Sequence, residues 1–383
     1  MSETQKLKQV AAVFFKLGLF AFGGPAAHIA MMEHEVVTKR AWMTREHYLD
    51  LIGATNLIPG PNSTEMTMHC GYQRAGKKGL FIAGISFVFP AVFITAILGY
   101  LYVLYGALPQ VQPFIKGIQP AVIVIIASAV IKLGKKAVKN WELALLGTLF
   151  LAASLLGLDQ VLVLFAGGLL GMCYFLIKSK MQSTTLAIAP LFMVFIVSEI
   201  GAKLSAMGIF LKFLKVGSIL YGSGYVLFAY LDTELVTTAL LSQNQLIEAI
   251  GIGQFTPGPV LSTATFIGYQ LGGFWGAIAA TAGIFMPSFL FVWLLNPLIP
   301  KMRKSKVLGY FLDSINVAAV AIMLAVLVTM SKQTLVDWQA TLIAVVSVVL
   351  IFKFKKVSVM WVLIIGAILG YVLASLFYCL EVS

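Results

Sequence analysis

Charged residues, cysteines and long polar stretches are scarce in this sequence. Only 11% of its 383 residues are charged and 3 are cysteines, whereas 60% are hydrophobic. Soluble domains are roughly half apolar and a quarter charged, so this composition excludes an ordinary soluble protein. The cysteines lie in apolar segments, where they are usually packing residues rather than a disulfide framework. We therefore expect an all-α polytopic membrane protein without a separate soluble domain.

Motifs of the common nucleotide-dependent and hydrolytic enzymes are also missing. The sequence has no phosphate-binding Gly-Lys-Ser loop, no nucleophile elbow and no His-Glu-x-x-His helix, so we expect neither an enzyme nor a cofactor. Glu33, His34, Glu35 and His47 flank a basic loop without metal-ligand spacing, so we expect no metal. The net charge of +12 lies in short loops, which is typical of membrane anchoring rather than nucleic-acid binding. Membrane lipid and a small anion are the expected partners, and a homodimer is left open.

Long apolar runs occupy most of the chain. Runs at 80–106, 117–133, 159–177 and 357–380 approach or exceed the ~20 apolar residues that cross a bilayer as a helix. Counted by hydropathy, the chain contains about thirteen hydrophobic segments.

A Pro-Gly-Pro motif interrupts two of these segments. It occurs as Pro59, Gly60 and Pro61, followed by Asn62-Ser63-Thr64-Glu65, and again as Pro257, Gly258 and Pro259, followed by Val260-Leu261-Ser262-Thr263. Proline stops an incoming helix, and the hydroxyl residues that follow cap a new one. A broken helix inside a bilayer is costly unless it is buried in protein or lines a water-filled cavity.

The two motifs belong to an internal duplication. Beyond Pro-Gly-Pro, Gly71-Tyr72-Gln73 aligns with Gly268-Tyr269-Gln270, Pro90 with Pro287 and Trp141 with Trp338. We expect a first repeat at 1–182, a linking transmembrane segment at 183–208 and a second repeat at 209–383.

Charge placement predicts that the repeats have opposite orientations. Loop 74–78 carries three basic residues and its counterpart at 271–275 none, whereas loop 298–306 carries four and its counterpart at 107–113 none. Basic loops stay on the cytoplasmic side, so equivalent loops lie on opposite sides of the membrane. Lys212 and Lys215, which lie near the start of the second repeat and on the outer side, are exceptions.

The basic loop 33–47 conflicts with full crossings by its neighbours. If segments 10–32 and 48–72 both crossed, this loop would be external, whereas two re-entrant hairpins keep it inside. We therefore expect discontinuous, re-entrant helices at the Gly-Gly-Pro and Pro-Gly-Pro motifs.

The half-helices that start after the Pro-Gly-Pro motifs are candidate oxyanion sites. Amides of residues 62 to 65 would be the unpaired first donors of a helix, near its positive dipole end. The candidate substrate ligands there are Asn62, Ser63 and Thr64, with Ser262 and Thr263 in the second repeat. The alternative is that each motif is only a capped packing kink.

The segments before the Pro-Gly-Pro motifs supply further candidates. Gly23 and Gly24 interrupt the first, Gly222 interrupts the second, and glycine permits close backbone approach. Lys16 and Lys215 hold equivalent places before these glycines and are candidate counter-ions for a dianion. The alternative for both lysines is snorkelling to the membrane interface.

Glu65 and His69 share one helix face and have no ionisable counterpart in the second repeat. A carboxylate beside an anion site is a proton carrier or a repulsive gate. Alternatively, Glu65 is a capping residue or is salt-bridged, with Lys16 as the candidate partner.

Specific motifs resemble a known family. The stretches FGGPAAHIAMMEHEVV, LDLIGATNLIPGPNSTE and GYQRAGKKG, with GQFTPGPV in the second half, resemble the long, two-domain chromate ion transporters over essentially the whole chain. The resemblance implies chromate efflux and chromate resistance at a bacterial or archaeal plasma membrane. Unit two lacks counterparts of Arg74 and Glu65, so the two halves need not contribute equally.

The resemblance leaves the substrate and the transport mode open. Sulfate and molybdate are tetrahedral dianions like chromate, so a sulfate or molybdate transporter is one alternative, and a passive anion channel is another. Because the cell interior is negative, outward movement of a dianion needs no other energy source. We therefore expect electrogenic export by a secondary transporter, with proton coupling optional.

Overall fold

The computed structural model describes residues 1–21, 24–179, 205–221, 224–296, 302, 305–354 and 357–382, and these residues form helices without any strand. In the first half the elements are α1 Glu3–Phe20, α2 Gly24–Glu33, the π-helix η1 His34–Lys39, α3 Arg45–Thr55, α4 Asn62–Tyr105, α5 Gln112–Ala137, α6 Trp141–Leu155 and α7 Gln160–Lys178. In the second half they are α8 Ala206–Ile219, η2 Gly224–Val226, α9 Leu227–Leu231, η3 Asp232–Val236, α10 Gln243–Phe255, η4 Val260–Ser262, α11 Thr263–Leu295, α13 Lys306–Thr334, α14 Trp338–Lys353 and α15 Val359–Val382.

The order of elements in the second half repeats that of the first. Among the described residues, 6 helices are long and apolar enough to cross a membrane. The chain is therefore a multi-pass, all-α membrane protein, as predicted. The expected count of about thirteen segments is not confirmed. Most of the predicted linking segment, from 183 to 204, lies outside the described residues.

Helix α4 is a helical hairpin rather than one straight rod. Its backbone leaves helical geometry at Ala75 and Gly76, where Gly76 has φ +61° and ψ −153°. A Cβ atom placed on Gly71 would lie 2.3 Å from the carbonyl oxygen of Gly79. Residues eight positions apart in a straight helix are ~12 Å apart along its axis, so the chain must fold back on itself.

Helix α11 makes the equivalent hairpin. Its turn lies at Gly272 and Gly273, where Gly273 has φ +61° and ψ −148°. A Cβ atom on Gly268 would lie 2.4 Å from the carbonyl oxygen of Gly276. Gly71 and Gly268, with their partners Gly79 and Gly276, therefore allow close contact between the two arms of each hairpin.

Contacts at one end of the molecule identify re-entrant segments. The Arg74 guanidinium lies 5.3 Å from the centre of the Trp42 ring, and Lys78 forms a 3.0 Å ion pair with Glu3. The start of α1, the loop before α3 and the turn of α4 therefore lie together. The chain leaves this end through α1 and returns to it after α2. It leaves again through α3 and returns at Arg74, in agreement with the re-entrant interpretation.

The long arms of α4 and α11 pack against each other in opposite directions. The rings of Phe81 and Phe289 are 5.9 Å apart, while Tyr100, near the end of the α4 arm, lies 6.2 Å from Tyr269, beside the turn that starts the long arm of α11. The beginning of each arm thus contacts the end of the other. Equivalent arms that run antiparallel place the two repeats upside down relative to each other, as the charge pattern predicts.

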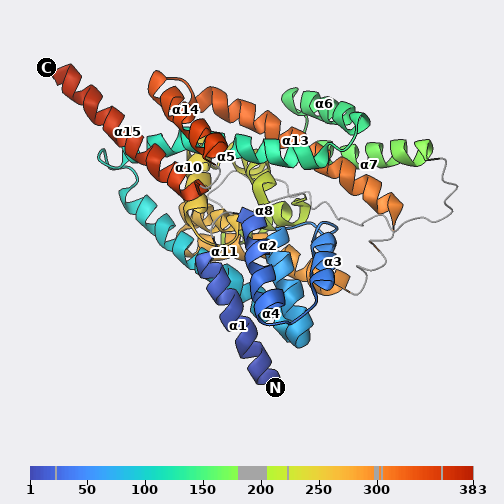
Figure 1. Cartoon of the computed structure of the whole chain (residues 1–383). Helices are drawn as coiled ribbons and strands as arrows, with labels where there is room; N and C mark the ends of the chain where they lie inside the picture. The colour runs from blue at the N-terminus through green and yellow to red at the C-terminus, as the bar shows by residue number, and fades with distance from the viewer. Residues whose placement is uncertain are drawn as a thin grey trace.

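Helices α5 and α13 are exchanged between the halves. Helix α5 packs on α14 and α15 of the second half, and α13 packs on α6 and α7 of the first. These helices gather on one side of the molecule, and α1 to α4 gather with α8 and α11 on the other (Figure 1). Each half therefore packs one of its long helices into the other half, and this packing holds the two halves together.

The basic loops gather at one end. Lys77 lies 5.8 Å from the centre of the Trp293 ring, and Lys139 pairs with Asp313 at 2.6 Å. These contacts join the turn of α4 to the end of α11, and the end of α5 to the start of α13. Of the two exceptions, Lys215 pairs with the Glu234 carboxylate at 2.5 Å, and Lys212 donates to the backbone carbonyl oxygen of Glu234 at 3.4 Å. One positively charged end is what the positive-inside rule requires.

We expect Gly71→Ala to destabilise the protein, because its new Cβ atom meets the backbone of Gly79 rather than a movable side chain. Overpacking of this kind costs about 1–3 kcal/mol. Thermal unfolding of the detergent-solubilised protein measures the effect. The matched control is Gly309→Ala in α13, where a Cβ atom meets nothing within 4 Å. Equal melting temperatures for the two variants would contradict the hairpin contact.

Candidate functional site

The four helix breaks meet at the centre of the molecule. The Gly60 amide in the first Pro-Gly-Pro motif donates to the carbonyl oxygen of Leu220 at 2.6 Å, and the Gly258 amide in the second donates to Ala21 at 2.9 Å. Leu220 and Ala21 are the residues at which the preceding helices of the opposite halves end. Each motif therefore satisfies the broken backbone of the other half.

A histidine supports one of these breaks. The carbonyl oxygen of Ala21 also lies 3.0 Å from the His28 Nε2 atom, and the buried His28 ring packs edge-on against Phe87. The imidazole thus spans the gap between α1 and α2. The break is held by a side chain of its own half and by an amide of the other half.

The first half-helix offers fewer free amides than expected. The amides of Thr64 and Glu65 both bond to the carbonyl oxygen of Pro61, at 2.8 and 3.1 Å. The expectation of four unpaired donors at residues 62 to 65 is therefore wrong for these two. The amides of Asn62 and Ser63 have no such intrahelical bond, and the Asn62 side chain donates to Asn56 at 2.9 Å.

Glu65 occupies the first turn of this half-helix. Its side chain is fully buried, and neither carboxyl oxygen has a hydrogen-bond partner among the described residues. A Cβ atom on Gly60 would lie 2.3 Å from Glu65 Oε1 and 2.4 Å from Ser288 Oγ, so these groups enclose Gly60. The first half therefore places its own carboxyl group beside the positive end of the helix dipole. Glu65 does not pair with Lys16, whose carboxylate partner is Glu35.

Hydroxyl groups after the second motif are engaged locally. Thr263 Oγ1 donates to the carbonyl oxygen of Val260 at 2.8 Å, and Ser262 Oγ lies 3.2 Å from Thr256 Oγ1. By contrast, Thr64 Oγ1 in the first half is buried without a partner among the described residues. The buried Ser63 lies beside it.

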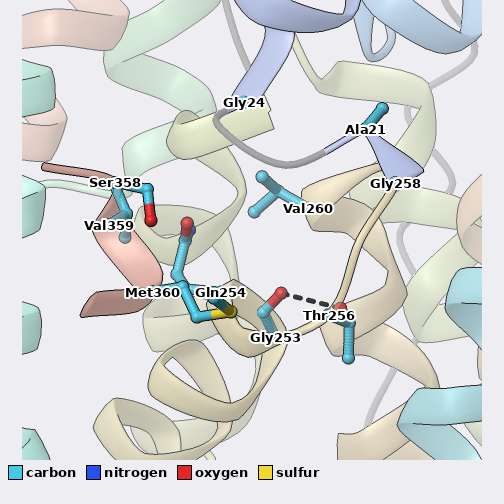
Figure 2. Close-up of a pocket in the computed structure, with 10 residues that line it drawn as sticks. All are labelled: Ala21, Gly24, Gly253, Gln254, Thr256, Gly258, Val260, Ser358, Val359 and Met360. Atoms are coloured by element: carbon cyan, nitrogen blue, oxygen red, sulfur yellow. Dashed lines mark hydrogen bonds between the residues drawn. The ribbon is translucent and has the colours of Figure 1, made fainter. Parts of the chain in front are cut away.

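A small cavity lies at the second motif (Figure 2). It is enclosed by the break between α1 and α2, the end of α10, the second Pro-Gly-Pro motif and the start of α15. The lining residues are Ala21, Gly24, Gly253, Gln254, Thr256, Gly258, Val260, Ser358, Val359 and Met360. None of these described lining residues is acidic. The cavity measures about 20 Å³, which holds about one water molecule and is too small for a tetrahedral oxyanion.

Hydrogen-bond donors face this cavity. Figure 2 shows the Gln254 side chain pointing toward Ser358, and Gln254 Nε2 has no hydrogen-bond partner among the described residues. The amides of Trp361 and Val362 bond to the carbonyl oxygen of Ser358 and so begin α15. The amides of Val359 and Met360 precede that first turn. A helix N-terminus and a free carboxamide donor are suited to an oxyanion.

The two lysines expected as counter-ions are paired within the protein. Lys16 lies 3.7 Å from Glu35, and Lys215 lies 2.5 Å from Glu234 at the equivalent place. Neither lysine lines the cavity at the second motif. Each lysine neutralises a carboxylate, and any contact with a substrate stays a prediction.

Several other expectations bear on this region. Gly23 and Gly222 lie outside the described residues. Gly24 lines the cavity with φ +80°. His69 is buried, and its Nδ1 atom lies 3.2 Å from the Asn296 side chain. In the described part of the chain, no three metal-ligating side chains gather.

Gln254, Ser288 and Ser358 were not predicted from the sequence. Gln254 had a signal, because it stands just before the second motif where Asn56 stands before the first. Ser288 and Ser358 had none, since each reaches the centre from a helix distant in the sequence.

Comparisons with known proteins agree with the two-repeat architecture. The model of the chromate transporter family matches residues 8–172 and again residues 207–371. A chromate transport protein of Cupriavidus metallidurans is 31% identical over 96% of this chain and 94% of its own length. A probable chromate transport protein of Synechococcus elongatus is 31% identical over 96% of both chains, and an uncharacterized transporter of Methanocaldococcus jannaschii is 27% identical over 94% of this chain and 92% of its own. No solved structure matches the chain.

We expect Gly60→Ala to disrupt the centre, because the new methyl group must displace both Glu65 and Ser288. The matched control is Gly157→Ala. Gly157 also has a positive φ, +85°, but a Cβ atom there meets nothing within 4 Å. We expect Gly60→Ala to lose about 1–3 kcal/mol more than the control, measured by thermal unfolding. An equal loss would show that backbone strain alone matters at Gly60.

Proposed function

Because the chain belongs to the chromate transporter family, we propose that it is a secondary transporter that exports chromate across the plasma membrane. We place the dianion at the half-helix N-termini that follow the Pro-Gly-Pro motifs. The family match over both repeats supports chromate transport. Relatives named as a chromate transport protein and as a probable chromate transport protein support it further.

The meeting of the four breaks at the centre carries the proposal. The amides of Asn62 and Ser63 begin one half-helix, and the second-motif cavity gathers Gln254, Ser358 and the start of α15. Neutral hydrogen-bond donors of the backbone and side chains can bind a tetrahedral anion. A fixed positive charge would bind the anion more tightly and slow its release. Ser262 and Thr263 contribute by shaping the second half-helix, since their hydroxyl groups are already engaged there.

The size of the cavity supports a carrier rather than an open channel. A space for about one water molecule does not conduct a dianion, so the protein must change shape to admit it. The bonds Gly60–Leu220 and Gly258–Ala21 cross between the halves, and relative motion of the halves would open one bond or the other. Inverted repeats that rock around a central site would thereby expose it to each side in turn.

The direction of transport follows from charge. Moving a dianion out of a negative cell interior gains roughly 4.6 kcal/mol per 100 mV, twice the single-charge value. This free energy can balance a difference of about three powers of ten between the chromate concentrations on the two sides. Export therefore proceeds without another energy source, whereas import would need several co-transported cations.

We expect purified protein in liposomes to catalyse chromate counterflow, because a carrier exchanges labelled for unlabelled substrate across the membrane. Counterflow is measured again with excess sulfate and with molybdate. Persistence of the flux in sulfate is the expected result for a chromate exporter. Loss of the flux at modest sulfate would identify sulfate as the preferred cargo, and single-molecule currents without counterflow would identify a channel.

We expect Asn62→Pro to reduce chromate affinity roughly tenfold to a hundredfold, the worth of one hydrogen bond to a charged group. Proline is tolerated at the first position of a helix, and Pro61 before it already has an extended ψ of 105°. The change thus removes the amide donor and leaves the helix. Affinity is measured from the concentration dependence of counterflow.

Two controls isolate the amide. Asn62→Ala removes the side-chain bond to Asn56 but keeps the amide. Gln160→Pro makes the same substitution at the first position of α7, away from the centre. Normal affinity in Asn62→Pro, or an equal loss in Asn62→Ala, would contradict an anion site built on this amide.

A further inference from the structure

Glu65 differs from every other buried acidic side chain in the described part of the chain. Glu35 pairs with Lys16, Lys39 and Arg40, Glu142 with Lys178, and Glu234 with Lys215. Asp232 accepts a hydrogen bond from Gln243, and Glu248 accepts hydrogen bonds from Tyr102 and Gln119. Glu65 is the most deeply buried of the set, and neither of its oxygens has a hydrogen-bond partner among the residues that the structure describes. Its carboxyl group is thus not built into a structural ion pair.

In the described parts of the chain, the groups that face Glu65 supply no fixed positive charge. Ser288 Oγ of α11 lies beside Gly60 on the same side as Glu65 Oε1 and is itself without a partner in the described structure. Tyr221, just before η2, interacts electrostatically with Glu65, and Tyr230 of α9 interacts with Tyr221. None of the ion pairs among the described residues includes Glu65. Only the positive end of its own half-helix offsets the cost of an ionised Glu65 here, and protonation removes that cost.

Glu65 also shares its helix end with the proposed anion site. The amides of Asn62 and Ser63, for which the described residues supply no acceptor, lie in the same first turn, so an anion there and an ionised Glu65 would compete for the same positive helix end. Two like charges this close repel each other, and binding of the anion therefore favours protonated Glu65. The second half has no such conflict, because Thr263 stands in the equivalent place.

We propose that Glu65 carries one proton across the membrane together with each anion. A proton from water on the loading side adds to a carboxylate oxygen of Glu65 as the anion binds, forming its O–H bond. On the other side that bond breaks, and the proton returns to water as the anion leaves. The inference rests on the proposed function and sharpens it, since the net charge moved becomes one negative charge per turnover.

His69 marks a route for this proton. It lies one turn beyond Glu65 on the same helix face, toward the turn at Ala75 and Gly76. Its Nδ1 atom contacts Asn296 at the end of α11, near the positively charged end of the molecule, and its Nε2 atom has no partner in the described structure. His69 therefore links Glu65 to the end that we assign to the cytoplasm.

The experiment measures chromate accumulation in proteoliposomes with the membrane potential clamped at zero. Both compartments are kept at pH values where chromate is fully deprotonated. With one proton per anion, a gradient of one pH unit should concentrate chromate about tenfold on the alkaline side. In Glu65→Gln the two concentrations should become equal, while Glu46→Gln, which removes an exposed acid from α3, should keep the tenfold ratio.

Each other result has a defined meaning. Accumulation on the acidic side, or a tenfold ratio in Glu65→Gln, would overturn the assignment. If counterflow occurs at equal pH but a pH gradient drives no accumulation of chromate, proton coupling would be overturned and the proposed transport would stand. No counterflow at equal pH would overturn the proposed transport itself.

A binding measurement covers the case in which Glu65→Gln does not turn over. Infrared difference spectra of the wild-type protein on adding chromate should show the gain of a protonated carboxyl band. That band should be absent in Glu65→Gln and present in Glu65→Asp, which keeps a titratable group. A wild-type spectrum without the band would overturn the proposal.

Discussion

The need to satisfy broken backbone inside a membrane organises this protein. Each unpaired amide or carbonyl group costs several kcal/mol in a hydrocarbon environment, so a helix that stops within the bilayer needs a partner. Here each half supplies the partner for the other, through Gly60 with Leu220 and Gly258 with Ala21. The inverted arrangement, the exchanged helices α5 and α13, and the tight glycine hairpins all serve to bring these four breaks together.

The near-symmetric scaffold carries an asymmetric centre. The first half places beside its half-helix a carboxyl group that has no hydrogen-bond partner in the described structure, and the second half places a cavity lined by donors beside its own. Duplication alone would give two equivalent sites with equal roles. The difference between Glu65 and Thr263 allows one half to respond to protons while the other contributes neutral ligands.

Much of the architecture could be predicted from the sequence, because the features involved are local or periodic. The Pro-Gly-Pro motifs, the aligned glycines and the basic loops predicted two inverted repeats with re-entrant helices. The sequence could not show that Lys16 pairs with Glu35, or that Ser358 reaches the second motif. Those contacts depend on how η1 packs beside α1 and on how the start of α15 packs against the end of α10 within the second half. The free amides after Pro61 were overestimated for a related reason, since Pro61 itself accepts two of them.

The sidedness of two equivalent positions tests the account most directly. Lys39 and Thr237 are exposed and follow the re-entrant segments of the first and second halves. Single cysteines at these positions, in a background without native cysteines, would be treated with a membrane-impermeant maleimide from each side. The account predicts that the cysteine at 39 reacts only from the cytoplasmic side and the cysteine at 237 only from the outside. Reaction of both from the same side would contradict the inverted, re-entrant architecture.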